Sequence, residues 1–222
     1  MPRRQDHTAQ ELTEMAIQAV AAHLQSAPAS QLSLRKVARD IGYSPGTLIN
    51  LFGSYDLLLL AFNARTLDAI QHQLLSAIQQ AAKNSSNSVI DQLAAAAGCY
   101  CDYARSHQHA WRLLFEHRLA DDHPLPDWQA QRIATLFTLI EDSLRRLNPQ
   151  ASSTACQTAA RVIWSGVHGI ATLMLDNKLF MASADHNPDS AATHSEQLIR
   201  SLLQHYLTDW CQRHQTDGGE PL

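Results

Sequence analysis

Side chains suited to contact nucleic acid gather between residues 33 and 52 of this 222-residue sequence. Thr47 and Asn50 can offer hydrogen bonds to the edges of DNA bases, which are the contacts that distinguish one DNA sequence from another. Helices that begin after Ser33 and Ser44 would add free backbone N–H groups for phosphate oxygens. Four nearby side chains are candidates for phosphate contacts: Ser33, Arg35, Lys36 and Tyr43.

Two short helices are predicted to hold these side chains. Ser33 is a good N-cap for the first helix, and Gly42 stands where a left-handed residue can end it. Ser44 can cap the second helix, and Pro45 suits its first position. Because a tight turn joins the two, the second helix can project from the fold and enter the major groove. The sequence therefore predicts a helix-turn-helix over residues 33–52, with an ordinary helical hairpin as the alternative.

The rest of the chain is also predicted to be helical. Apolar residues recur at helical spacing from Leu12 to Leu24, and Pro28 ends that helix. Further helices are expected near residues 57–82, 89–106, 108–119, 126–147, 152–176 and 190–213. No stretch alternates between apolar and polar residues as a strand does, so we predict an all-α fold of about nine helices.

Composition favours an ordinary globular protein and adds a weak electrostatic signal. The net charge is −4, which is not typical of nucleic-acid-binding proteins. The first 55 residues carry five basic and four acidic side chains, whereas the remainder carries 12 basic and 17 acidic ones. The sign of this asymmetry suits an N-terminal DNA-binding module. No membrane span and no secretory signal is found, so a cytoplasmic location is expected.

Neither catalysis nor metal binding is predicted. The sequence contains 12 His, but no two of them lie four apart on one predicted helix. The imidazole rings of His107 and His109, two positions apart, would point to different sides of a helix. Neither a Gly-rich phosphate loop nor a Gly-x-Ser-x-Gly turn is present. The four Cys are expected to be reduced thiols, because their spacing fits neither a zinc ribbon nor a CxxC redox pair. An enzyme is therefore the weakest of the function classes considered.

Two C-terminal helices are candidates for an interface. Residues 162–175 are apolar around nearly the whole helix, so we expect burial on more than one side. The last helix carries an apolar stripe made of Leu198, Ile199, Leu202, Leu203, Tyr206, Leu207 and Trp210. This stripe either faces the core of its own chain or packs against a second copy. Dimerisation would place two recognition helices on a two-fold axis, where they can read a palindrome.

Residues 10–70 resemble the DNA-binding domain of the TetR/AcrR family. The match includes Ile41-Gly42-Tyr43-Ser44-Pro45-Gly46-Thr47-Leu48, Phe52 and Leu57-Leu58-Leu59. The resemblance implies DNA contacts by Ser33, Arg35, Lys36, Tyr43, Ser44, Pro45, Gly46, Thr47, Leu48, Asn50, Leu51 and Tyr55. The family's usual residues are replaced by Ile49, Asn50, Leu51 and Tyr55. Since Tyr55 replaces a common Lys and brings no charge, a shallow salt dependence of DNA binding is expected.

The C-terminal part resembles a subset of that family named for a Trp-His-Gly signature. Trp164-Ser165-Gly166-Val167-His168-Gly169-Ile170 and Ala110-Trp111-Arg112-Leu113-Leu114-Phe115 carry this resemblance. It implies a cavity for a small, largely apolar effector, with Tyr103, Trp111, Phe115, Phe137, Trp164 and His168 as candidate lining residues. It also implies a homodimer through the last two helices, with Leu198, Leu202, Leu203, Tyr206 and Trp210 as candidates. Plain core packing is the alternative for all of these aromatic residues.

The resulting expectation is a ligand-responsive repressor that binds a double-stranded DNA operator. The DNA-binding domain is predicted at residues 10–70 and the effector-binding and dimerisation domain at 71–213, with flexible tails at 1–9 and 214–222. No cofactor is expected besides the effector. The alternative is a helical interaction protein with degenerate DNA binding, because Ile49, Leu51 and Tyr55 depart from the family pattern.

Overall fold

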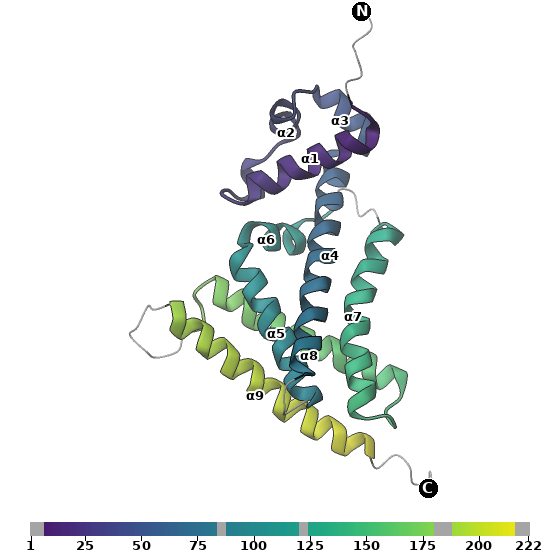
Figure 1. The fold of residues 1–222 in the computed structure, drawn as a ribbon, viewed down its shortest axis with the longest axis vertical. Coiled ribbons are helices and arrows are strands. Elements are labelled where there is room, and N and C mark those ends of the chain that lie inside the picture. The colour runs from purple at the N-terminus through teal and green to yellow at the C-terminus, as the bar shows by residue number, and fades with distance from the viewer. Residues whose placement is uncertain (1–6, 84–87, 120–123, 180–187, 216–222) are drawn as a thin grey trace, which may run out of the picture. The chain divides into compact units, whose positions relative to one another are not determined.

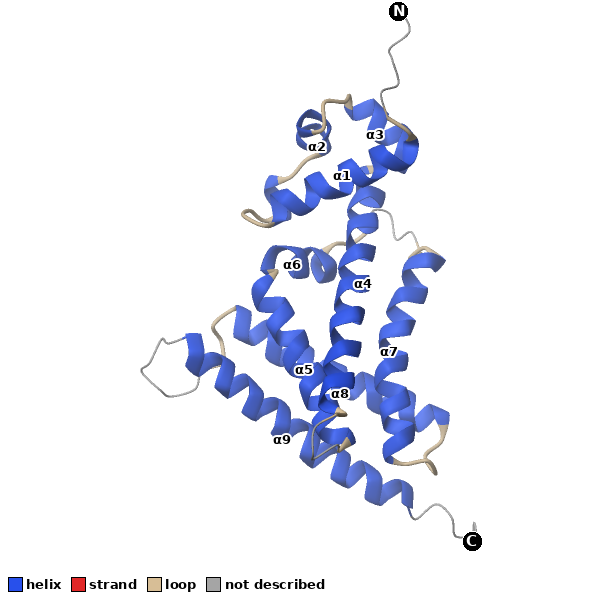
Figure 2. Cartoon of the chain, viewed as in Figure 1, coloured by secondary structure: helices blue, strands red, loops and turns tan. Residues whose placement is uncertain are grey.

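The computed structural model describes residues 7–83, 88–119, 124–179 and 188–215, of which 188–193 and 215 are described for the backbone alone. In these ranges all regular structure is helical and no strand occurs, as Figure 2 shows. The elements are α1 (Ala9–Leu24), η1 (Ala29–Gln31), α2 (Leu34–Asp40), α3 (Pro45–Phe52), α4 (Tyr55–Ala81), α5 (Val89–Ser106), α6 (Gln108–Glu116), α7 (Asp127–Leu147), α8 (Ser153–Leu175) and α9 (Pro188–Gln215). The predicted all-α fold is confirmed.

The chain divides into two compact units. The first combines Met1–Asp68 with His107–Ala130, and the second combines Ala69–Ser106 with Gln131–Leu222. The predicted domain border near residue 70 is close to this division, but α6 belongs to the first unit rather than to the C-terminal part. The reason is packing, because Ala110 and Leu113 of α6 join the apolar core that α1 to α4 form.

Local signals explain how the first unit begins. The Thr8 hydroxyl accepts a hydrogen bond from the Glu11 amide at 3.2 Å, and the Glu11 carboxylate accepts one from the Thr8 amide at 2.7 Å. This reciprocal capping box satisfies N–H groups that the first turn of α1 would otherwise leave free. Residues 7–9, predicted as part of a flexible tail, therefore include the cap and the start of α1. At the other end α9 reaches Gln215, while 1–6 and 216–222 lie outside the described residues.

The first unit is held by an apolar core to which α1, α2, α3, α4 and α6 contribute. Ala16 and Val20 of α1, Val37 of α2, Leu48 of α3 and Leu58 of α4 are completely buried. Burial of such side chains is the main favourable term in folding. The core therefore fixes α2 and α3 against α1 and the first turns of α4.

Several helix borders differ from the prediction. Helix α6 ends at Glu116 rather than near residue 119, and α9 runs from Pro188 to Gln215 rather than from 190 to 213. A 3₁₀ turn, η1, follows Pro28 where only a helix end was predicted. Helix α4 begins at Tyr55, two residues earlier than predicted, because the Ser54 hydroxyl accepts a hydrogen bond from the Leu57 amide at 3.0 Å. Ser54 therefore acts as the N-cap of α4, and only Gly53 and Ser54 separate α3 from α4.

The second unit is built on the contacts among α5, α8 and α9 (Figure 1). Its interior contains Tyr100 of α5, Ile163 and Val167 of α8, and Leu203 and Leu207 of α9, all buried. Within the described helices, none is by itself long and apolar enough to cross a membrane, although α3 and α4, bent by 65°, pass the same test when joined.

Candidate nucleic-acid interface

The predicted caps and turn of the helix-turn-helix are present. The Ser33 hydroxyl accepts a hydrogen bond from the Lys36 amide at 3.2 Å, and the Ser44 hydroxyl accepts one from the Thr47 amide at the same distance. Between the two helices, Gly42 has a φ of +77°, a conformation that side-chain-bearing residues rarely adopt. These features confirm the local prediction for residues 33–52.

Helix α3 has one buried side and one exposed side. Leu48 is completely buried in the core of the first unit, so we correct its assignment as a DNA contact: it anchors the helix. Pro45, Gly46 and Asn50 are exposed, and Ile49 is 39% exposed. A helix anchored in this way can present its remaining side chains to the major groove.

Two side chains predicted to contact DNA, Thr47 of α3 and Tyr43 of the preceding turn, form polar contacts within the protein. The Thr47 side chain is half-buried, and its hydroxyl lies 2.9 Å from the Ser44 hydroxyl. The Tyr43 hydroxyl lies 2.7 Å from Nδ1 of His7, and the two rings meet edge to face. Leu51 is half-buried, whereas Ser33 and Arg35 are exposed and Lys36 is half-buried.

Tyr55 does not fit its predicted role as a phosphate contact. Its hydroxyl is buried and, among the described residues, has no hydrogen-bond partner. Burial raises the pKa of Tyr55 to about 12, with a smaller contribution from the negative charge of Asp56. We therefore correct this assignment: the Tyr55 ring packs against the core of the first unit and its hydroxyl does not reach solvent.

Ile49 and His7 are surface features that sequence reasoning missed or undervalued. In sequence Ile49 is a departure from the family pattern, but in the structure it is exposed next to Asn50 and offers an apolar group of the kind that contacts the methyl group of thymine. His7 contacts Tyr43 across 36 positions of sequence. No sequence signal pointed to it, because a single His before an N-cap carries no pattern.

The six predicted effector-pocket residues fall into two groups. Trp111 and Phe115 belong to the first unit, where their ring centroids are 4.8 Å apart. In the second unit Phe137 meets Trp164 edge to face at 5.6 Å, and Trp164 stacks on His168 at 5.0 Å. Tyr103 is buried in the same unit. The structure thus brings three of the six together, and their effector role stays a prediction.

Tyr100 joins this second group although it was not predicted. Its hydroxyl lies 2.8 Å from Nδ1 of His168. Burial lowers the pKa of His168, which favours the neutral imidazole that can share a hydrogen bond with a phenol. The sequence signal that could have identified Tyr100 is its polar hydroxyl on the otherwise apolar face of α5.

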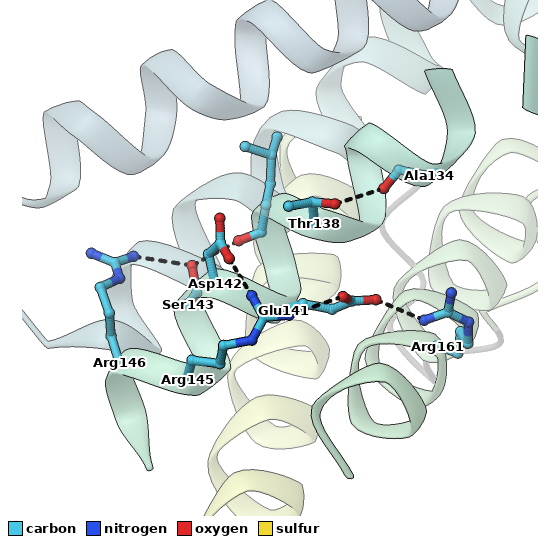
Figure 3. Close-up of polar contacts among 9 residues, drawn as sticks. Ala134, Thr138, Glu141, Asp142, Ser143, Arg145, Arg146 and Arg161 are labelled. Carbon is cyan, nitrogen blue, oxygen red and sulfur yellow. Dashed lines mark hydrogen bonds and ion pairs between the residues drawn. The ribbon is translucent and has the colours of Figure 1, made fainter. Parts of the chain in front are cut away.

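An ion-pair network lies beside these rings, between α7 and α8 (Figure 3). Glu141 of α7 is only 7% exposed, and its carboxylate accepts hydrogen bonds from Arg161 of α8 at 2.9 Å and from Arg145 at 3.4 Å. The Arg161 guanidinium also lies over the Phe137 ring, 4.5 Å from its centroid. The buried carboxylate is therefore paired, and the network joins α7 to α8.

The apolar stripe of α9 divides into a buried and a half-buried part. Leu203 and Trp210 are buried within the second unit, so we correct their assignment to a dimer interface: they are core residues. Leu198, Leu202 and Tyr206 are half-buried. A Cβ atom at Gly166 of α8 would lie 2.6 Å from Leu202, so the missing side chain permits the close approach of α8 and α9.

The second unit also contains a cavity of about 940 Å³ between α4, α5 and α9. None of the six predicted pocket residues lines it. Its walls are the helix faces that carry Ser76, Ala95 and Ile199. In the part of the chain that the structure describes, no three His, Cys, Asp or Glu side chains are grouped so that they could hold a metal ion.

Comparison with known proteins decides the family. The family model for the tetracycline repressor-like C-terminal domain matches residues 93–203, half of the chain. The chain belongs to the TetR family. As a TetR-family member it is a DNA-binding transcriptional regulator, which agrees with the capped helix-turn-helix at its N-terminal end. No curated protein matches the chain in sequence.

Solved structures share the TetR-like fold at low sequence identity. A protein of unknown function from Rhodococcus sp. RHA1 is 19% identical, with a TM-score of 0.68 over 94% of this chain and 98% of its own. A TetR-family transcriptional regulator from Rhodococcus sp. is 20% identical, with a TM-score of 0.57 over 87% and 99%. A transcriptional regulator from Pseudomonas aeruginosa PAO1 is 16% identical, with a TM-score of 0.61 over 94% and 98%. These likenesses concern the fold.

Proposed function

We propose that this TetR-family regulator is a ligand-responsive repressor that binds a palindromic operator as a homodimer. The observation that carries the proposal is the division of α3, which anchors itself through the completely buried Leu48 and exposes Asn50 and Ile49. The exposed amide can form hydrogen bonds with a base edge, and the adjacent aliphatic group can contact a thymine methyl group. Arg35 and Ser33, both exposed, are the proposed phosphate contacts.

The surface of α8 supports a homodimer. Val162 and Leu173 are each 42% exposed and lie 11 positions apart, which is about three helical turns, so they share one face. Between them, a Cβ atom at Gly169 would meet nothing within 4 Å. An apolar face with open space over its backbone suits close packing against another helix. The proposed occupant is the same face of a second copy, joined by the half-buried Leu198, Leu202 and Tyr206 of α9.

A response to a small molecule is supported by the cavity in the second unit, because its volume lies within the range of ligand sites in proteins. A ligand that prefers one of two conformations shifts the equilibrium only by its difference in affinity for them. Repression is proposed as the sign of control, and the cytoplasm as the location, since a regulator acts where its DNA is.

Selection of DNA from a random library with the purified full-length protein tests the core of this proposal. We expect the bound sequences to converge on two half-sites related by a two-fold axis and spaced by about one helical turn, 34–36 Å. Analytical ultracentrifugation should show a dimer. The variant Asn50→Ala should no longer discriminate among bases at one defined position of each half-site. A library that does not converge would favour a helical interaction protein with degenerate DNA binding, and a strictly monomeric protein would contradict the homodimer.

A further inference from the structure

The cavity between α4, α5 and α9 has a middle made of small residues. From α4 it is lined by Ala77 and Ser76, and from α5 by Ala94, Ala95 and Gly98. A Cβ atom at Gly98 would meet nothing within 4 Å, so the space extends to the backbone of α5. The three helices therefore line an open groove wide enough for a hydrocarbon chain. Its lining also includes the polar side chains of His72, Gln73 and Gln80, while the carboxylates and guanidinium groups lie toward its two ends.

Both ends of the cavity carry carboxylates. At one end Asp102 pairs with Arg105 at 2.8 Å. At the other end one guanidinium, that of Arg200, pairs with both Asp91 at 3.4 Å and Glu196 at 3.2 Å. The lining thus has three carboxylates and two guanidinium groups, and its surplus of negative charge lies at the second end.

These carboxylates remain accessible to a ligand. The side chains of Asp102 and Glu196 are 66% and 63% exposed, and that of Asp91 is 36% exposed. A carboxylate has about four lone-pair sites, so one that pairs with Arg can still accept hydrogen bonds from an ammonium group. Asp91 and Asp102 are 11 residues apart on α5, which corresponds to about 16 Å along the helix.

We propose that this cavity binds an elongated organic diamine, with an aliphatic middle over Gly98, one ammonium group beside Asp102 and the other beside Asp91 and Glu196, where the surplus negative charge lies. The site is separate from the aromatic group around Trp164. Its regulatory role rests on the proposed ligand response, whereas the binding itself does not. An ammonium at each end would make charge-assisted hydrogen bonds, which are stronger than neutral ones.

The experiment is calorimetric titration of the full-length protein with dodecanediamine, whose extended length suits the separation of the two acidic ends. Dodecanedioate, of the same length and opposite charge, and butanediamine, which is too short to reach both ends, are the matched probes. We expect saturable binding of one dodecanediamine per chain, at least about tenfold tighter than either control, because each charge-assisted hydrogen bond contributes roughly this factor.

Two variants locate the binding within the cavity. Gly98→Leu projects a large side chain into the open space and should abolish dodecanediamine binding. Gly98→Ala is its control: it adds only a Cβ atom and should retain binding. Glu196→Gln removes one exposed carboxylate and should weaken dodecanediamine about tenfold without weakening dodecanedioate. Thermal unfolding of each variant verifies that it folds.

The results separate this proposal from the proposed function. Absence of dodecanediamine binding, equal binding of dodecanedioate, or unchanged binding by folded Gly98→Leu would overturn the assignment of the site. Operator affinity measured with and without dodecanediamine is a second readout. If the diamine binds in the cavity but leaves operator affinity unchanged, the site is supported, and the ligand response through this cavity is contradicted.

Discussion

Helices α3 and α9 bury very different shares of their apolar side chains. In α3 only Leu48 is completely buried, and the neighbouring Ile49 remains exposed. In α9 the buried set comprises Ile199, Leu203, Leu207 and Trp210. Helix α3 is therefore held by a small buried contact that leaves part of its surface exposed, whereas most of the apolar stripe of α9 packs within its own unit. A regulator needs the first arrangement for binding and the second for stability.

The largest expected effect tests the buried side of α9. Trp210 is 2% exposed, so Trp210→Ala removes a large core side chain and should lower the free energy of unfolding by about 3–5 kcal/mol. Chemical denaturation followed by circular dichroism, at one fixed protein concentration, measures the change. The exposed neighbour substitution Gln212→Ala should change it by less than about 0.5 kcal/mol. A loss of dimer with unchanged monomer stability would instead place Trp210 at an interface.

The next prediction separates the two sides of α3. Leu48→Ala should destabilise the protein by about 2–5 kcal/mol, because it leaves a cavity in a completely buried position. Asn50→Ala should leave stability nearly unchanged and reduce discrimination at one base pair by about 1–3 kcal/mol. Denaturation and operator titration of both variants give the comparison. If Asn50→Ala destabilises as strongly as Leu48→Ala, α3 has no free binding face.

Tyr55 at the start of α4 provides a smaller, pH-dependent test. Its folded-state pKa of about 12 exceeds the ordinary value of 10.0, so folding favours the neutral phenol. The stability linked to this group is therefore fully present below pH 10 and is lost as the pH rises toward 12. We expect Tyr55→Phe to be at least as stable as the wild type at neutral pH, since the buried hydroxyl has no partner among the described residues.

Denaturation of both proteins between neutral pH and pH 12 measures this difference. The wild type should lose stability relative to Tyr55→Phe above pH 10, whereas the other ionisable groups cancel in the comparison. Parallel stability curves would show that the Tyr55 hydroxyl ionises in solvent. In that case the Tyr55 hydroxyl would be accessible, and its predicted contact with a DNA phosphate would stand.

The smallest expected effect concerns the flank of the helix-turn-helix. Arg35 is exposed on α2, so Arg35→Gln should reduce the slope of log affinity against log salt concentration by about 0.9. Operator titration at several salt concentrations measures the slope. Arg213→Gln, at the end of α9, is the matched control and should leave the slope unchanged. Equal slopes for the wild type and Arg35→Gln would remove Arg35 from the phosphate contacts.

Prediction from sequence worked best where neighbouring residues decide the structure. The caps at Ser33 and Ser44, the left-handed Gly42 and the start of α3 at Pro45 all depend on interactions within a few positions. The family resemblance of residues 10–70 depended on the same local pattern. The helix-turn-helix could therefore be assigned before its packing was known.

Prediction failed where a side chain has more than one possible environment. An apolar residue such as Leu48 or Leu203 fits a core, a partner surface or a DNA contact equally well by its type, and only its burial distinguishes them. The same holds for the Tyr55 hydroxyl, which could have faced solvent. The residues that line this cavity were not predicted because they come from three helices, and no single stretch of sequence carries the pattern.

The sequence by itself determined the presence of the helices, the caps at Ser33 and Ser44 and the helix-turn-helix, because capping, left-handed glycine and apolar periodicity act within a few turns of chain. Only the tertiary structure decided that Leu48, Leu203 and Trp210 are core, that Tyr100 meets His168, and that α6 packs on α1. Those outcomes depend on which surfaces meet after long segments have folded back, and burial is a property of the neighbours as much as of the residue.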